Sequence, residues 1–133
     1  MFTGTYTAIV TPFNQDGSID YGALKALVAW QIESGVDGIV PVGTTGESPT
    51  LDHKEHMEVI RVAAEAARGH LRVIAGTGAN ATAEALSLTR EAIEIGVDGT
   101  LQVTPYYNKP NQEGLYRSLK SLYHLHLYPK FLY

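Results

Sequence analysis

The 133-residue sequence predicts an α/β fold built on a parallel sheet. Its apolar, β-branched runs lack the period-2 alternation of half-exposed strands, which is typical of strands buried on both faces. Segments of helical periodicity separate these runs, and such alternation indicates parallel strands joined by right-handed crossovers. The third observation is a short internal repeat. Gly-Val-Asp-Gly occurs at 35–38 and again at 96–99, about two βα units further on.

Strands and helices are expected to alternate along the chain. Asp20 is the expected N-cap of a first helix, which Gly35 ends. Asp52, with Glu55 three residues later, has the pattern of a capping box at the start of a second helix. Thr82 begins the third helix, and the glycine at the second Gly-Val-Asp-Gly ends it. The strands are expected at 7–10, 38–42, 71–75 and 100–103, and a fourth helix at 112–125.

The regular spacing of these units favours a barrel over an open, doubly wound sheet, but periodicity alone leaves both architectures open. No linker divides the chain before residue 113. From Gly114 to Tyr133 there is no Asp or Glu, and tyrosines become frequent. The composition therefore changes in this last part of the chain.

Charge and composition exclude several classes of protein. Ten Lys and Arg against 14 Asp and Glu give a net charge of −4, so no basic field exists to hold a nucleic acid. No run approaches the ~18 apolar residues of a membrane span, and the first residues lack the pattern of a secretory signal. We therefore expect no membrane partner and a cytoplasmic location. Without cysteine, thiolate catalysis and Cys-ligated metals are excluded.

Hydroxyl residues and glycines follow each expected strand, at the end of the sheet where α/β folds bind ligands. Such neutral donors suit a carboxylate or carbonyl better than a triphosphate. In the loop 43–47, Thr44 and Thr45 can bind an anion or relay a proton, and a tight turn capped by its threonines explains the loop equally well. For Tyr106 and Tyr107 we expect one proton-relaying phenol and one packing aromatic.

Two other motifs are weaker. Gly76-x-Gly78-x-x-Ala81 matches a dinucleotide fingerprint, but the acid it requires, Asp98, precedes its strand instead of following it. Nicotinamide binding is therefore disfavoured, and we expect no cofactor. His53 and His56 lie at i, i+3 on a helix without a third ligand nearby. They are expected to face a polar pocket or cap the helix, not to bind a metal.

The lysines add a negative observation. A carbonyl-processing enzyme of this architecture often uses a lysine whose pKa is lowered by burial at a strand end, so that its amine forms a Schiff base. No lysine lies inside any of the four expected strands, and all five are expected to be solvated: Lys25, Lys54, Lys109, Lys120 and Lys130.

Four segments together resemble the dihydrodipicolinate synthase family: 8–13, 43–48, 74–80 and 103–110. The resemblance runs from Met1 to about Tyr116 and implies a (β/α)₈ TIM barrel, of which 133 residues are roughly half. The chain is thus expected to form one partial barrel domain over 1–133, with about four βα units and the approach to a fifth strand. Residues 1–116 are family-like and 117–133 form a divergent tail.

The resemblance also implies an activity, the condensation of pyruvate with aspartate semialdehyde through a lysine Schiff base in lysine (diaminopimelate) biosynthesis. Thr44, Tyr107 and Tyr133 match the family's catalytic proton relay, with Tyr107 reaching across a dimer interface. Thr45 matches a second threonine on the pyruvate side. The family also implies a homo-oligomer, a dimer of dimers.

A further set of residues matches the positions that bind the inhibitor lysine in feedback-regulated members. Position 49 departs from that pattern: regulated members can have a small residue such as alanine there, and this sequence has Pro49. The matching residues are Ser48, His53, His56, Asn80, Glu84 and Tyr106.

The family's Schiff-base lysine has no counterpart in this sequence, so we expect the 133 residues to be inactive alone. A second hypothesis is a non-catalytic half-barrel interaction module that pairs with itself or with a full-length paralogue. A third is another pyruvate aldolase, such as N-acetylneuraminate lyase. The run Tyr106–Pro110 favours the synthase.

Overall fold

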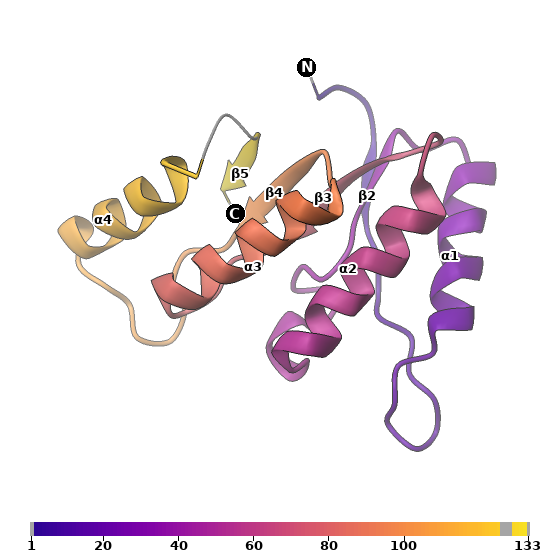
Figure 1. The fold of residues 1–133 in the computed structure, drawn as a ribbon, viewed down its shortest axis with the longest axis horizontal. Helices are drawn as coiled ribbons and strands as arrows, with labels where there is room; N and C mark the ends of the chain where they lie inside the picture. Colours follow the sequence, from indigo (N-terminus) through magenta and orange to yellow (C-terminus); the bar gives the residue numbers. More distant parts are fainter. Residues whose placement is uncertain (1, 126–128, 133) are drawn as a thin grey trace.

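The computed structural model describes residues 2–125 and 129–132. Five parallel strands form one sheet in the order β1-β2-β3-β4-β5 (Figure 1). The strands are β1 (Tyr6–Ala8), β2 (Gly38–Val40), β3 (Arg72–Gly76), β4 (Gly99–Gln102) and β5 (Lys130–Leu132). The helices are α1 (Tyr21–Glu33), α2 (His53–Ala67), α3 (Thr82–Ile95) and α4 (Gln112–Tyr123), with a short 3₁₀ helix at Ser48–Thr50.

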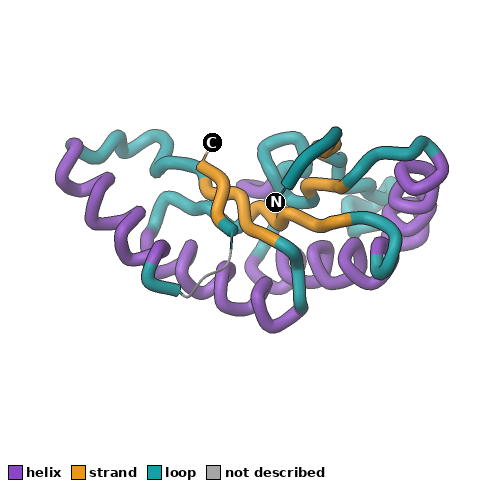
Figure 2. The backbone as a smooth tube through the Cα atoms, turned by 90° about the horizontal axis from the view of Figure 1, so that it is seen from above, coloured by secondary structure: helices purple, strands orange, loops and turns teal. Residues whose placement is uncertain are grey.

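The helices all cover the same face of a curved sheet (Figure 2). A doubly wound sheet reverses its strand order and carries helices on both faces. The sequential order and the one-sided helical layer therefore settle the choice in favour of a barrel segment. Leu24, Val28, Ile39 and Ile60 are fully buried between the helices and the sheet.

The predicted helix starts are confirmed. The Asp20 carboxylate accepts the amide of Ala23 at 2.8 Å. Asp52 and Glu55 form the reciprocal capping box, with distances of 2.8 and 3.0 Å between side chain and amide. α3 begins at Thr82 without a side-chain cap.

The repeated Gly-Val-Asp-Gly ties neighbouring strands together at their amino ends. Each copy begins with a left-handed glycine that ends a helix. The Asp37 carboxylate then accepts the amide of Thr5, just before β1, at 2.7 Å. Asp98 accepts the amide of Val73 in β3 at 2.8 Å. The two copies thus perform the same structural task in successive parts of the sheet.

The expectation that all five lysines are solvated is wrong for Lys130. This residue begins β5, and its ammonium group donates to the carbonyl of Leu125 at 3.2 Å. Burial lowers the pKa of Lys130. Because it stands at the amino end of its strand, Lys130 is remote from the carboxyl ends where the other candidate residues gather. The remaining four lysines are exposed.

Candidate functional site

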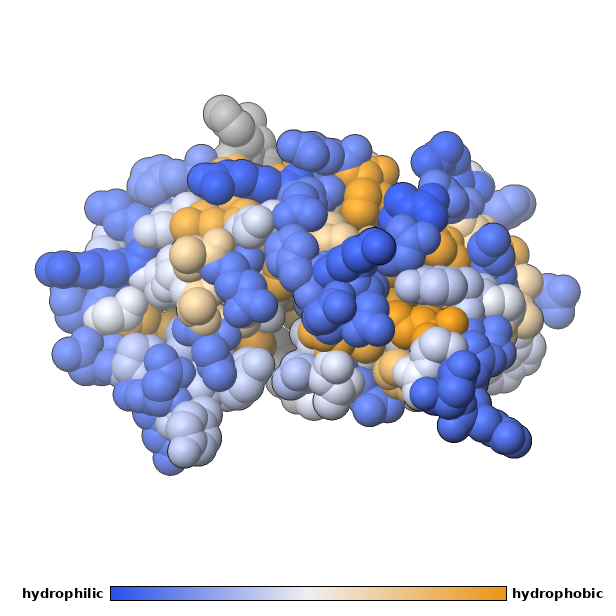
Figure 3. Space-filling view, turned by 60° about the horizontal axis from the view of Figure 1, so that its bottom comes forward, coloured by the Kyte–Doolittle hydropathy of each residue, from blue (hydrophilic) through white to orange (hydrophobic). Residues whose placement is uncertain are grey.

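Two adjacent cavities open at the carboxyl ends of the strands. These strand ends lie toward the bottom of Figure 1. The face that turns forward from there is mostly hydrophilic, with apolar residues in separate patches (Figure 3). The apolar cavity has a volume of about 270 Å³ and the polar cavity about 210 Å³. The two share four wall residues: Ser48, Pro49, Gly78 and Tyr106.

The loop after β2 forms one wall of the apolar cavity. The buried Thr11 hydroxyl donates to the Gly46 carbonyl at 2.7 Å, which holds the loop from the β1 side. Glu47 has a left-handed backbone, with a φ of 60°, where the chain enters the 3₁₀ helix. Thr44 and Thr45 are both exposed, and of the two Thr44 lines the apolar cavity.

β3 carries a glycine where the loop after β2 crosses it. A Cβ atom on Gly76 would overlap the carbonyl of Val42, whose own φ of 53° is left-handed. No residue larger than glycine fits this crossing without displacement of backbone. The close approach brings the exits of β2 and β3 to the same wall of the apolar cavity.

His56 is the most deeply buried titratable group of the polar cavity, with 3% of its surface exposed. Its Nε2 lies 2.7 Å from the carbonyl oxygen of Gly76, so Nε2 carries the proton and donates it. Burial lowers the pKa of His56 and keeps the imidazole neutral. Its Nδ1 is therefore a hydrogen-bond acceptor.

Other acceptors gather in the same cavity. The Oδ1 atom of Asn80 is buried and has no hydrogen-bond partner within the described part of the chain. Glu84 supplies a carboxylate from the first turn of α3, and Ser48 supplies a hydroxyl. A cavity rich in acceptors suits a ligand that carries N–H donors, such as an ammonium group.

His53 also lines the polar cavity, and its Nε2 lies 2.7 Å from a carboxylate oxygen of Glu91. Sequence reasoning missed Glu91. A signal for it existed, because Glu84 and Glu91 are seven residues apart and share one face of α3. The side chain of Ser87 donates to the same Glu91 oxygen at 3.0 Å.

The two adjacent tyrosines differ sharply. Tyr106 lines both cavities and is 42% exposed. Tyr107 is 94% exposed, lines neither cavity and has a φ of 65°, which is rare for a side-chain-bearing residue. Tyr133 lies outside the described residues. Of the two predicted relay residues that the structure describes, Thr44 lines the apolar cavity and Tyr107 lines neither cavity.

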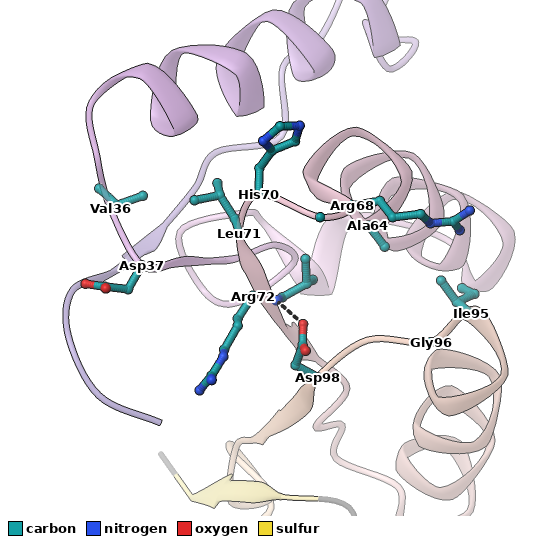
Figure 4. A pocket seen from close by; sticks show the side chains of 12 residues that line it. Val36, Asp37, Ala64, Arg68, His70, Leu71, Arg72, Ile95, Gly96 and Asp98 are labelled. Carbon is teal, nitrogen blue, oxygen red and sulfur yellow. Dashed lines mark hydrogen bonds between the residues drawn. The ribbon is translucent and has the colours of Figure 1, made fainter. Parts of the chain in front are cut away.

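A third cavity, of about 520 Å³, lies at the amino ends of the strands. The basic side chains of its wall, Arg68, His70 and Arg72, point in different directions (Figure 4). Asp98 is in this wall, and its carboxylate accepts a hydrogen bond from the Val73 amide. It therefore lies at the amino end of the sheet, whereas the ribose of a dinucleotide binds at the carboxyl end. We therefore assign no ligand to this cavity.

Within the described ranges 2–125 and 129–132, no group of three or more His, Asp or Glu residues is arranged to hold a metal ion. Over the same residues, the helices are all too short or too polar to cross a membrane.

The fold and the site define the class: an α/β barrel segment that gathers neutral donors and acceptors at the carboxyl ends of its strands. The chain belongs to the dihydrodipicolinate synthetase family, whose model matches residues 1–133. The predicted family and the partial-barrel fold are thereby confirmed.

Individual relatives agree. The chain is 56% identical to the 4-hydroxy-tetrahydrodipicolinate synthase of Chelativorans sp. (strain BNC1) over 133 residues, which are 100% of this chain and 45% of the relative. The chloride-inhibited dihydrodipicolinate synthase of Acinetobacter baumannii, solved with pyruvate, matches with a TM-score of 0.94 and 49% identity, over 98% of this chain and 45% of that one. The enzyme of Cyanidioschyzon merolae with lysine bound matches with a TM-score of 0.93 and 45% identity, over 96% and 44% of the two chains. The chain thus spans a little under half the length of these relatives.

Proposed function

We propose that this chain carries the first part of a 4-hydroxy-tetrahydrodipicolinate synthase, an enzyme that condenses pyruvate with aspartate semialdehyde in the cytoplasm. One observation carries the proposal. The six residues that the resemblance assigns to lysine binding come from the 3₁₀ helix, two α-helices and two loops, and all of them line the polar cavity. These positions, separated by as much as 58 residues, from 48 to 106, are brought together where the exits of β2, β3 and β4 meet at one edge of the sheet.

The polar cavity is proposed to bind free lysine as an effector. Its acceptors, namely Asn80 Oδ1, the Glu84 carboxylate and the neutral His56 Nδ1, suit the two ammonium groups of lysine. The relative solved with lysine supports this ligand. Pro49 stands in the wall that the polar and apolar cavities share, so it contacts both sites.

The apolar cavity is proposed as the start of the pyruvate site, with Thr44 as its proton-relaying hydroxyl and Thr45 as a neighbour. The relative solved with pyruvate supports this substrate. Tyr107 is proposed to act in the partner subunit of a homo-oligomer. Its exposed phenol and left-handed backbone hold the ring away from its own chain, as a residue that crosses an interface requires.

In the described part of the chain no lysine is buried at the carboxyl end of a strand, since Lys109, in the loop after β4, is exposed and Lys130 begins β5. The chain alone is therefore proposed not to form the Schiff base. Incubation with pyruvate and borohydride, followed by mass spectrometry, tests this. We expect no added mass, and Lys130 serves as an internal control for a partly buried but misplaced amine. A pyruvyl adduct on any lysine would overturn the proposal.

Calorimetric titration with lysine tests the polar cavity. Binding of lysine, with loss of binding in the variants Asn80→Leu and Glu84→Gln, is the expected result. Arginine and norleucine are the matched controls, since the first changes the shape of the distal cation and the second removes it. Equal heats for lysine and norleucine would contradict the proposed acceptor set.

A second function rests on the strand edges. β1 and β5 each pair with one neighbour only in the part of the chain that the structure describes, and open edges favour pairing with another chain. The half-barrel is then an interaction module that pairs with itself or a full-length paralogue. Light scattering after size exclusion decides, because a folded monomer at high concentration would count against self-pairing.

A further inference from the structure

A buried polar cluster lies between the sheet and α3, on the opposite side of the strands from the barrel interior. The side-chain amide of Gln102 in β4 lies 2.7 Å from the hydroxyl of Thr77, 3.1 Å from that of Thr89 and 3.2 Å from that of Thr100. The hydroxyls of Thr77 and Thr89 lie 2.9 Å apart. All four side chains are buried. We call this set the Gln102 cluster.

The Gln102 cluster is a polar group in an otherwise apolar layer. Buried amides and hydroxyls destabilise a fold unless they are hydrogen-bonded, and a satisfied network specifies one arrangement of the elements that it joins. The amide nitrogen of Gln102 donates to the three hydroxyls, while its buried Oε1 atom has no hydrogen-bond partner among the described residues. Gln102 therefore joins the exits of β3 and β4 to α3.

The two strand exits that the cluster joins both supply residues to the wall of the polar cavity. Thr77 directly follows β3, and its amide donates to the Leu101 carbonyl of β4 at 3.0 Å. The next residue, Gly78, approaches the backbone of Val103 so closely that a Cβ atom would overlap it. Two residues after Gly78 comes Asn80, and three after Val103 comes Tyr106, both in the wall of the polar cavity.

We infer that Gln102 is a positioning residue for the polar cavity: its amide fixes the spacing between the β3 and β4 exits, and so the distance between Asn80 and Tyr106. Gln102 does not line either cavity. The ligand in this inference rests on the proposed function, but the positioning itself does not.

The test uses three variants of the 133-residue chain. Gln102→Met removes the amide at similar length, and Thr77→Val removes the hydroxyl on the β3 exit. Thr89→Val is the matched control, because it removes a hydroxyl of the same cluster from α3 and leaves both strand exits joined. Should Gln102→Met fail to fold, Thr77→Val carries the test.

The first measurement is amide hydrogen exchange. A loss of global stability accelerates exchange of the Thr77 amide and of the Leu24 amide of α1 equally, whereas loosening of the strand exits accelerates Thr77 alone. We expect Gln102→Met and Thr77→Val to raise exchange at Thr77 about tenfold more than at Leu24, which corresponds to about 1.4 kcal/mol of local opening. Thr89→Val is expected to change both amides alike. The same pattern in all three variants would overturn the inference.

The second measurement is the dissociation constant for lysine. We expect it to rise about tenfold in Gln102→Met and Thr77→Val and to stay within about twofold in Thr89→Val. If the unsubstituted chain binds no lysine but the exchange pattern appears, the proposed effector function fails and the positioning inference stands. If lysine binds equally to all variants and Thr77 is not selectively loosened, the inference fails and the proposed function stands.

Discussion

The two ends of the sheet differ in which residue types have a left-handed backbone. They differ also in whether their polar side chains are hydrogen-bonded to the backbone. At the amino ends, the left-handed residues that connect helix to strand are glycines: Gly35, Gly69 and Gly96. At the carboxyl ends of β2 and β4 they bear side chains: Val42, Glu47, Tyr107 and Lys109. Left-handed backbone costs a side-chain-bearing residue of order 1–3 kcal/mol, and such strain concentrates at functional sites.

The polar side chains also differ between the amino and carboxyl ends of the sheet. At the amino ends, the carboxylates of Asp37 and Asp98 accept backbone amides. At the carboxyl ends, Asn80 keeps a buried acceptor without a partner among the described residues, and Glu84 stands in the cavity wall. The carboxylates of Asp37 and Asp98 at the amino ends are thus satisfied by backbone amides, whereas Asn80 and Glu84 at the carboxyl ends line the polar cavity.

The largest expected effect separates two glycines. Gly76→Ala, at the carboxyl end, should lower the free energy of unfolding by about 3 kcal/mol, because its Cβ meets the Val42 backbone. Gly96→Ala, at the amino end, should lower it by about 1 kcal/mol, because its Cβ meets nothing within 4 Å and only the φ of 90° opposes it. Urea unfolding measures both, and equal losses would contradict the distinction between close approach and backbone dihedral.

The next effect tests the repeated motif at the amino ends. Asp98→Ala should cost about 2 kcal/mol, because it leaves the amide of the buried Val73 without its acceptor. Asp37→Ala removes the equivalent bond from the exposed Thr5, whose amide water can reach, and should cost less than about 1 kcal/mol. Neither variant should change lysine affinity. A change in that affinity would show that the two ends are coupled.

A pH dependence tests the carboxyl end. Burial, and next the nearby His53, lower the pKa of His56 below its usual 6.5, against the opposing Gly76 hydrogen bond and the carboxylates of Glu84 and Glu91. The unfolded chain therefore takes up a proton first as the pH falls. The free energy of unfolding should drop below about pH 6.5, by at most about 1.4 kcal/mol per pH unit, until the folded-state pKa is reached.

The matched variants for this pH dependence are His56→Gln and His53→Gln. His56→Gln should flatten the fall of stability with pH, measured by urea unfolding between pH 7 and 5. His53→Gln should preserve most of it, because His53 is exposed. If His53→Gln flattened the curve instead, burial of His56 would not be its origin.

The sequence predicted the starts and ends of the helices well, at both ends of the sheet, because their causes are local. Caps at Asp20 and Asp52 and the stop at Gly96 depend on a few consecutive residues. β5 was anticipated only as the approach to a strand. The Tyr- and Leu-rich stretch before it shows neither the periodicity of a helix nor that of a strand. At the carboxyl ends, hydroxyl-rich exits indicated a site, and convergence on the polar cavity required the family resemblance.

Two features of the carboxyl end depend on tertiary structure. The burial of Gln102 was hidden, because strands buried on both faces show no alternation that assigns a residue to the helix side. Which of the two adjacent tyrosines lines the cavities was likewise not predictable from the spacing of the residues alone. It is set by the positive φ of Tyr107, which adjacent tyrosines do not reveal.

The smallest expected effect has opposite signs for two exposed tyrosines. Tyr107→Gly should raise the free energy of unfolding by about 0.5 kcal/mol, because relief of left-handed strain outweighs the added freedom of the unfolded chain. Tyr116→Gly, in α4, should lower it by about 1 kcal/mol, since glycine disfavours a helix interior. Thermal unfolding of both variants measures the contrast. If Tyr107→Gly destabilises the chain as Tyr116→Gly does, the left-handed turn at Tyr107 is not strained. The backbone at the carboxyl end of β4 would then store no strain energy at this residue.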